Sequence, residues 1–287
     1  MLDLAVAHDA ETFERIRGPL ADRGVRARHV RSAERTVDLT APPWNPADFD
    51  VGFVYPGRVM EGGVLDAVLD VPWLNDRDAV LSSRNKAGVV AALARADVPV
   101  PDTTLVSNPV DEADVAAVFD RFDPPVVVKP NSTTRGVGVA KAHDVDSFLG
   151  VVDYLDLVHD YRATGDRSFL VQEYLPDARD YRVMVLDGEY VGAVERRLPD
   201  AARAAGRWKH NVHRGAAARR VDLPGDLRRL AETAARELDV PFLGVDLLVT
   251  GDRAVVNETN ARPTVDDAEK YESGFYDRLA AAIRARA

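Results

Sequence analysis

The sequence of 287 residues contains no cysteine. This absence excludes disulfides, thiolate metal sites and cysteine nucleophiles, and it is typical of a cytoplasmic protein. No run of 18 or more apolar residues is present, so we expect no spanning helix and no membrane partner. The first residues, Met1 to Asp9, lack a basic flank and a cleavage site, and they predict a buried strand rather than a signal peptide.

Lysine is also scarce, because only five of the 37 Lys and Arg residues are lysine, while the net charge is −10. The acidic balance argues against a nucleic-acid partner. It indicates a salt-adapted cytoplasm, although a GC-rich genome would also favour arginine over lysine. In either background each remaining lysine is a stronger functional candidate. The five are Lys86, Lys129, Lys141, Lys209 and Lys270.

Strands that alternate with helices predict an α/β fold, with α+β character in its later parts. We expect a small parallel-sheet domain at residues 1–81, a middle segment at 82–170 and a C-terminal segment at 171–287. A helix is expected at 83–96. The Ala-rich, alternately charged stretch 199–206 is predicted to be a mobile loop.

Two strings near the C-terminus predict a β-hairpin. Residues 244–250 and 254–260 are each strand-like, and Gly251-Asp252-Arg253 between them indicates a turn. The length of that turn decides which side chains share a face of the sheet, because a shift of one residue reverses every side chain.

A three-residue loop would place Asp246 opposite Glu258, with Asn260 on the same face. A two-residue loop would pair Asp246 with Asn257 and put the two acids on opposite faces. In the first case carboxylate and amide oxygens converge, and these are ligands that suit Mg²⁺. The alternative interpretation is a solvated polar face on an ordinary hairpin.

A lysine at the end of a strand is the second chemical signal. Val126-Val-Val-Lys129 is followed by a polar loop that contains Gly136 and Gly138 and leads into another strand. Hydroxyls and closely approaching backbone N–H groups in such a loop can cradle a phosphate. The pattern is neither a P-loop nor a Rossmann turn. An ordinary structural turn remains the alternative.

Two further strings carry polar residues. The strand Phe169–Tyr174 turns polar and ends near Pro176, so Glu173 and, beyond it, Asp180 can accept from a base or sugar; a strand end with an acidic loop is the alternative.

The string from Trp208 to Gly215 holds two histidines three residues apart, but no cysteine or third histidine lies near them to complete a zinc site. Its lysine, asparagine and arginine side chains are better suited to binding an anion.

Taken in order, these strings resemble the ATP-grasp superfamily and, within it, the RimK-like amino-acid ligases that add glutamate through an amide bond. The resemblance covers nearly the whole chain. It implies an ATP-grasp fold, in which a small parallel-sheet N-terminal domain precedes two α+β lobes that clamp ATP.

The resemblance also implies roles for particular residues. The implied nucleotide-binding residues are Lys86, Lys129, Glu173, Tyr174, Asp180, Lys209, His210 and Asn211. Two Mg²⁺ ions, replaceable by Mn²⁺, would be bridged by Asp246, Glu258 and Asn260. The arginines implied to steady the substrate carboxylate and the transferring phosphoryl group are Arg182, Arg197 and Arg214.

The implied activity is ATP-dependent ligation of a carboxylate to an amine through an acylphosphate. The implied partners are ATP, an amino acid such as glutamate, and an amine or carboxylate acceptor on a protein or small molecule. The alternatives are an ATP-grasp phosphotransferase and a non-catalytic nucleotide-binding module. The sequence leaves a homo-oligomer open.

The chain departs from the ribosomal-protein glutamate ligases directly after Asn260, where Ala261-Arg262-Pro263 replaces their Pro-Gly continuation. We expect Arg262 to lie at the mouth of the phosphate site and to bind a substrate carboxylate bidentately. The alternative is a surface ion pair with Asp266, Asp267 or Glu269.

Overall fold

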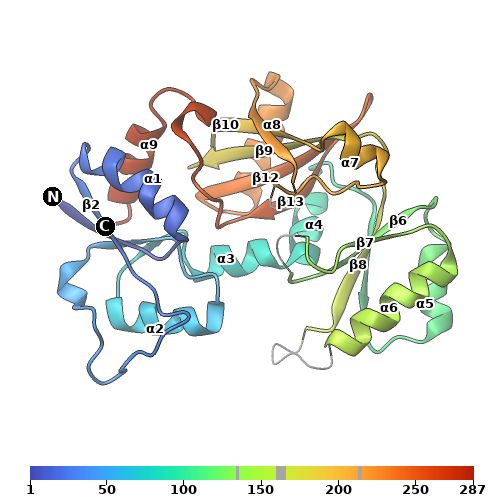
Figure 1. Ribbon diagram of the computed structural model, residues 1–287, viewed down its shortest axis with the longest axis horizontal. Helices are drawn as coiled ribbons and strands as arrows, with labels where there is room; N and C mark the ends of the chain where they lie inside the picture. Colours follow the sequence, from blue (N-terminus) through green and yellow to red (C-terminus); the bar gives the residue numbers. More distant parts are fainter. Residues whose placement is uncertain (134–135, 160–165, 213–214) are drawn as a thin grey trace.

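The computed structural model describes residues 1–133, 136–159, 166–212 and 215–287. The described chain forms three sheets, which follow one another along the sequence (Figure 1). None of the described helices is long and apolar enough to cross a membrane.

The first sheet is the small parallel sheet that the sequence predicts, with strand order β2-β1-β3-β4. Helix α1 begins after Asp9, whose carboxylate accepts a hydrogen bond from the backbone N of Thr12 at 2.8 Å, and it buries Ile16 and Leu20. From β1 the chain continues to β2 on one side of the sheet, and from β3 it continues to β4 on the other side. The carboxyl ends of β1 and β3 therefore border the crevice of this sheet. The elements are β1 (Leu2–Val6), α1 (Ala10–Ala21), β2 (Val25–His29), η1 (Pro46–Asp48), β3 (Val51–Phe53), α2 (Val59–Leu69) and β4 (Trp73–Leu74).

The helix predicted at 83–96 corresponds mainly to α4 (Lys86–Arg95), whereas residues 83 and 84 form the end of a separate helix, α3 (Arg77–Arg84). The predicted start is wrong because Asn85 separates the two helices. The Asn85 side chain accepts from the backbone N of Gly88 at 3.1 Å, which makes it the cap of a new helix. This break fixes Lys86 at the first position of α4.

The middle sheet is antiparallel, with strand order β5-β8-β6-β7. It has its own apolar core, in which Phe148 and Phe169 are fully buried. The predicted boundary between 170 and 171 falls inside β8, which pairs with β5 and β6 on both sides of that point. The elements of this lobe are β5 (Thr103–Ser107), α5 (Glu112–Phe119), β6 (Val126–Pro130), β7 (Ala140–Ala142), α6 (Val145–His159) and β8 (Ser168–Glu173).

The third sheet is antiparallel, with strand order β11-β10-β9-β12-β13, and α8 packs on it. Its apolar core is continuous with that of the first sheet, whereas the middle sheet stands apart (Figure 1). The segment 199–206, predicted to be a loop, contains the short helix α7. The elements are β9 (Arg179–Leu186), β10 (Glu189–Arg197), α7 (Asp200–Ala204), β11 (Ala217–Arg220), α8 (Gly225–Glu237), β12 (Phe242–Val249), β13 (Ala254–Asn260), η3 (Ala268–Lys270) and α9 (Phe275–Arg284).

The hairpin of β12 and β13 has the register that places Asp246 opposite Glu258, as predicted. The reason differs from the prediction. Val249 pairs with Ala254, so four residues form the loop, and a β-bulge at Asn257 then shifts the pairing by one residue. Without that bulge the two acids would lie on opposite faces of the sheet.

Candidate active site

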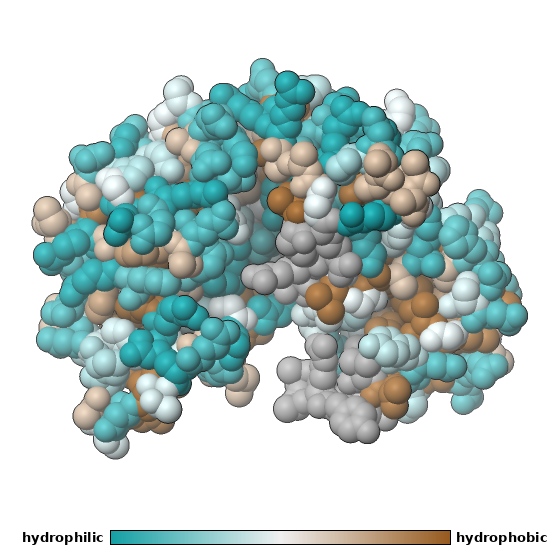
Figure 2. Space-filling model, in the orientation of Figure 1, coloured by the Kyte–Doolittle hydropathy of each residue, from teal (hydrophilic) through white to brown (hydrophobic). Residues whose placement is uncertain are grey.

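A cavity of about 700 Å³ lies between the middle sheet and the third sheet. Strands β6 and β8 contribute one wall, β9, β10, β12 and β13 the other, and the segment 206–211 closes a side. Figure 2 shows the molecule hollowed between the lobe that carries α5 and α6 and the rest of the chain, with a largely hydrophilic surface. The predicted site residues that line the cavity are Lys86, Lys129, Glu173, Tyr174, Asp180, Arg197, Lys209, His210, Asn211, Asp246 and Glu258.

The charge of this cavity is opposite to that of the chain. Among the described residues, its lining carries nine Lys and Arg side chains and six Asp and Glu side chains, although the whole chain has a net charge of −10. Four of the five lysines lie here, and the fifth, Lys270, pairs with Asp266 at 2.7 Å. A cationic hollow in an acidic protein favours a polyanionic ligand.

Two buried lysines reach the cavity from different elements. Lys129, on β6, donates to the Gln172 side-chain oxygen at 2.9 Å and to the backbone oxygen of Asn257 at 3.4 Å. Burial lowers the pKa of Lys129 to about 8. Lys86 lies 3.5 Å from Glu258, and burial lowers its pKa as well. Both ammonium groups have lost most of their contact with water. A bound anion such as phosphate would therefore stabilise their charged forms.

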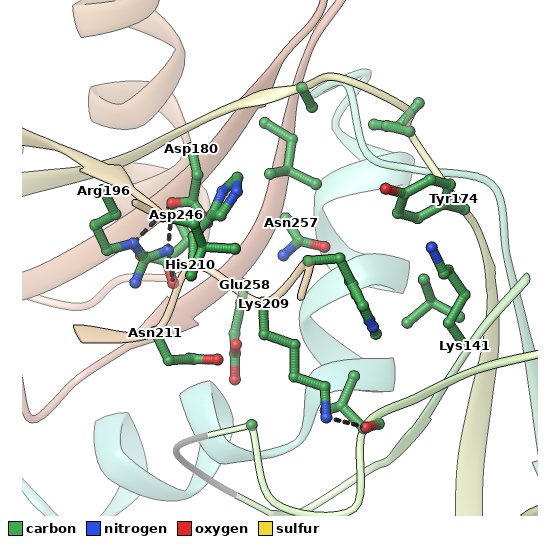
Figure 3. A pocket seen from close by; sticks show the side chains of 18 of the residues that line it. Lys141, Tyr174, Asp180, Arg196, Lys209, His210, Asn211, Asp246, Asn257 and Glu258 are labelled. Carbon is green, nitrogen blue, oxygen red and sulfur yellow. Dashed lines mark hydrogen bonds and ion pairs between the residues drawn. The ribbon is translucent and has the colours of Figure 1, made fainter. Parts of the chain in front are cut away.

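A row of charged side chains alternates in sign across the third sheet. The register pairs Asp180 on β9 with Arg196 on β10, and Arg182 on β9 with Asp246 on β12, so all four share one face. Arg196 lies 2.6 Å from the Asp180 carboxylate and 2.9 Å from that of Asp246 (Figure 3). Arg182 bonds Asp246 at 2.8 Å.

The ionisation of Asp246 follows from these contacts. Its burial raises the pKa, but the guanidinium groups of Arg182 and Arg196 outweigh that effect and hold the pKa below its usual value. Arg196 is buried and its pKa is raised, because the two carboxylates outweigh the effect of burial. The result is a fixed carboxylate that faces the cavity in its charged form.

Of the three predicted metal ligands, Asp246 and Glu258 line the cavity and Asn260 does not. The Asn260 side-chain oxygen accepts from the backbone N of Arg262 at 2.9 Å. Within the described ranges, no group of three or more His, Cys, Asp or Glu side chains could hold a metal ion. Two carboxylates suffice for Mg²⁺ when a substrate supplies phosphate oxygens.

Aromatic rings and a lysine lie together at the other end of the cavity. Tyr174 meets Trp208 edge to face, with ring centroids 5.9 Å apart. The Lys141 ammonium lies 4.5 Å from the Tyr174 ring and 5.6 Å from that of Trp208 (Figure 3). A planar, electron-rich heterocycle suits such a surface.

The segment after α7 supplies a further side of the cavity. Lys209 donates to the backbone oxygen of Val139, and the His210 ring nitrogen lies 3.6 Å from Asp180. Asn211 borders Gly136, where an added Cβ would lie 2.8 Å from the Asn211 side-chain oxygen. Arg214, another predicted site residue, lies outside the described residues.

The Glu173 side chain has a structural role in this conformation. It accepts two hydrogen bonds from Arg253, at 2.8 and 3.0 Å, and one from the backbone N of Asp102 at 2.8 Å. These bonds tie β8 of the middle lobe to the hairpin loop of the third sheet. The Glu173 side chain is therefore engaged within the protein, and the backbone N of Glu173 donates to the Asp102 oxygen at 3.0 Å.

Arg262 lies in a different place from the one the sequence predicts. It does not line the large cavity; its guanidinium lies in a second cavity at the first sheet. Nor does it pair with Asp266, Asp267 or Glu269, because it donates to backbone oxygens of Ala7, Val54 and Tyr55. The predicted position fails because the chain turns away from the large cavity after Asn260.

Several residues of the site escape sequence reasoning. Arg196 is the buried arginine of the network, whereas the predicted Arg197 beside it is exposed at the cavity edge. Gln172 and Trp208 also line the cavity, and so does Asn257, at the bulge. Lys141 lines the cavity as well, and in the sequence it is marked only by the scarcity of lysine.

Comparison with solved structures defines the fold. The chain aligns with a RimK domain ATP-grasp protein of Sphaerobacter thermophilus at a TM-score of 0.68 and 23% identity, covering 99% of this chain and 98% of that one. It aligns with a D-alanine–D-alanine ligase of Bacillus anthracis at a TM-score of 0.71 and 16% identity, covering 100% and 97%. The fold is therefore the ATP-grasp fold, as the sequence predicts.

Sequence comparison identifies the family within this fold. Residues 83–279 match the RimK-like ATP-grasp domain, and the chain belongs to that family. It is 34% identical over 199 residues to a protein of Enterobacter sp. (strain 638) named "Probable alpha-L-glutamate ligase". It is 32% identical over 199 residues to the ribosomal protein bS6–L-glutamate ligase of Escherichia coli O139:H28. Each match covers 69% of this chain but only 62% of the relative's length.

Proposed function

We propose that this chain is an ATP-dependent ligase that joins a carboxylate to an amine through an acylphosphate. The observation that carries the proposal is the approach of buried Lys86 and Lys129 to the Glu258 side of a cationic cavity. Two relatives named as glutamate ligases support it. They also support glutamate as the amino acid.

ATP is assigned to the large cavity by the chemistry of its two ends. The triphosphate lies against Lys86 and Lys129, whose largely buried ammonium groups supply positive charge. The adenine lies at the end formed by Tyr174, Trp208 and Lys141, where aromatic and cationic groups meet. The Glu258 and Asp246 carboxylates face the phosphates.

The donor set fits Mg²⁺, because Asp246 and Glu258 provide hard carboxylate oxygens on one face of the hairpin. The Asn260 side-chain oxygen keeps a second lone pair beyond its bond to the Arg262 backbone and is the third candidate ligand. When bound, Mg²⁺, or Mn²⁺ in its place, neutralises charge on the phosphates. Arg182 and Arg196 keep Asp246 ionised and oriented for this task.

The reaction proceeds in two displacements. A carboxylate oxygen of one substrate attacks the γ-phosphorus, the bond from that phosphorus to the bridging oxygen breaks, and ADP leaves. The amine nitrogen of the second substrate then attacks the acyl carbon, the carbon–oxygen bond to phosphate breaks, and phosphate leaves with loss of a proton from nitrogen. The protein's part is to align the reactants and balance the phosphate charge.

A phosphate-release screen tests the proposal. The purified chain is incubated with ATP, Mg²⁺, single amino acids and candidate acceptors, and products are identified by mass spectrometry. We expect phosphate and ADP to form only when both a carboxylic acid and an amine are present, with an amide product. A phosphorylated alcohol without free phosphate would show the alternative phosphotransferase, and ATP binding without any turnover would show a nucleotide-binding module.

A further inference from the structure

A second cavity of about 320 Å³ lies at the carboxyl ends of β1 and β3. This is the crevice of the parallel sheet, where α/β folds bind their ligands. Arg262 enters it from the C-terminal part of the chain, two residues after Asn260. The polar residues that line it are His8, Asp9, Arg31, Ser32, Arg58 and Arg262, and Gly57 lies among them.

The Arg262 guanidinium is largely buried, and its hydrogen-bond partners among the described residues are main-chain oxygens. It donates to Val54 at 3.1 Å, to Ala7 at 3.2 Å and to Tyr55. Burial lowers the pKa of Arg262 to about 10. In the described part of the chain no carboxylate forms a direct ion pair with it; the Asp9 carboxylate, which lines the same cavity, attracts the charge without contact. A buried cation in this state favours an anionic ligand.

The other charged groups of the cavity already have partners. Arg31 pairs with Glu34 at 3.0 Å, and Arg58 pairs with Glu34 at 3.0 Å and Glu61 at 3.3 Å. Asp9 lies 3.0 Å from His8 and also caps α1. In the part of the chain that the structure describes, the lining of the cavity carries three arginines and one carboxylate, that of Asp9, so positive charge is in excess there.

The Nε edge of the Arg262 guanidinium borders Gly57. A Cβ at that position would lie 3.2 Å from the Arg262 Nε. Nε takes part in none of the three hydrogen bonds of this guanidinium, which use its two terminal nitrogens. Glycine thus leaves room beside a free N–H donor. Gly57 does not have a positive φ, so its backbone conformation does not require glycine. The absence of a side chain is what leaves space beside Nε.

We propose that the second cavity is a carboxylate subsite, in which Arg262 binds a carboxylate of the amino-acid substrate. The assignment rests on the proposed ligase function, because an amino acid that reacts through its amine keeps its carboxylates for recognition. The Asn260 side chain bonds the backbone N of Arg262. The subsite is therefore joined to the hairpin that carries Asp246 and Glu258.

The test measures binding, so that it does not depend on turnover. L-Glutamate is titrated into the full chain with a non-hydrolysable ATP analogue and Mg²⁺, by calorimetry and by NMR of the arginine Nε–H groups. The Arg262 signal is assigned from its loss in Arg262→Lys. We expect L-glutamate to shift that signal and to bind at least tenfold more weakly to Gly57→Ala, which keeps every charge but narrows the space at Nε.

Gly63→Ala is the matched control. Gly63 lies in α2 outside the cavity lining, and an added Cβ there would meet only the Tyr55 hydroxyl, at 3.9 Å. We expect its affinity for L-glutamate to match that of the natural chain, and the affinity of all variants for the ATP analogue to stay within twofold. The Gly57→Ala variant keeps the test valid even where Arg262→Lys weakens the fold.

The outcomes separate the subsite from the ligase function. An unmoved Arg262 signal, or equal L-glutamate affinity in Gly57→Ala, overturns the subsite even where phosphate release still requires the amino acid. A shifted Arg262 signal with weaker binding to Gly57→Ala supports the subsite, and it does so even where no amide product forms. Glutarate, which has both carboxylates and no amine, is expected to shift the same signal; a response that requires the amine overturns a carboxylate subsite.

Discussion

The Arg196 guanidinium lies 2.9 Å from the Asp246 carboxylate, although their strands, β10 and β12, are separated by β9. The arginine reaches across β9 and bonds Asp180 as well. This contact connects β10 with β12, the strand that carries a candidate metal ligand, Asp246. Removing either partner would leave the other buried charge with one compensating partner fewer, Arg182 for Asp246 and Asp180 for Arg196.

Arg196→Gln is predicted to destabilise the chain by about 3–5 kcal/mol, because Asp180 and Asp246 would lose a buried cation. Arg197→Gln, at the exposed neighbouring position, is predicted to change stability by less than about 0.5 kcal/mol. Urea unfolding of the two variants and the natural chain measures the difference. Equal stability of the two variants would contradict the assignment of the network to Arg196.

Glu258→Gln is predicted to leave the fold intact and to remove most turnover. The change keeps the shape of the side chain but removes a carboxylate that faces the phosphates, at a cost on the order of several kcal/mol in transition-state stabilisation. Steady-state phosphate release at saturating Mg²⁺ is the measurement. Glu269→Gln, at an exposed position in η3, serves as the control, and near-normal turnover in Glu258→Gln would exclude the metal role.

Lys129→Arg is predicted to weaken ATP binding at least tenfold. Lys129 is buried beside Gln172, and a longer, planar guanidinium cannot take the place of its compact ammonium. Lys270→Arg is predicted to be silent, since Lys270 only pairs with Asp266 and Asp267 outside the cavity. Calorimetry with an ATP analogue compares the two. If both variants bound the ATP analogue with the same affinity, the scarcity of lysine would not mark functional residues in this chain.

ATP affinity is predicted to fall as the pH rises from 7 to 9. Burial lowers the pKa of Lys129 to about 8, so its ammonium charge is present below pH 8 and is lost above it in the free protein. One pH unit above that pKa the loss is about tenfold in affinity. The Lys129→Gln variant is expected to bind weakly with a flatter profile. A fall of equal size in that variant would assign the titration to another group.

Local chemistry in the sequence was enough to find most of the large cavity. The strand that ends at Lys129, the polar end of β8 at Tyr174 and the segment at Lys209 each carry their signal within a few residues. Their positions along the chain follow from apolar patterning, and the tertiary structure brings them into one cavity. The choice between Arg196 and Arg197 is different, because it depends on the face that β10 turns toward the site, and a bulge at Tyr190–Gly192 interrupts its pairing with β9.

The sequence by itself determined the α/β and α+β character of the chain, the residue types of the site and the scarcity that marks its lysines. The tertiary structure decided where the side chains of the site lie and which of them meet. The pairing of Asp246 with Glu258 depends on a bulge at Asn257, and the position of Arg262 depends on backbone oxygens more than 200 residues earlier in the chain. Register and long-range contacts of this kind are set by non-local hydrogen bonds and packing, which no short stretch of sequence specifies.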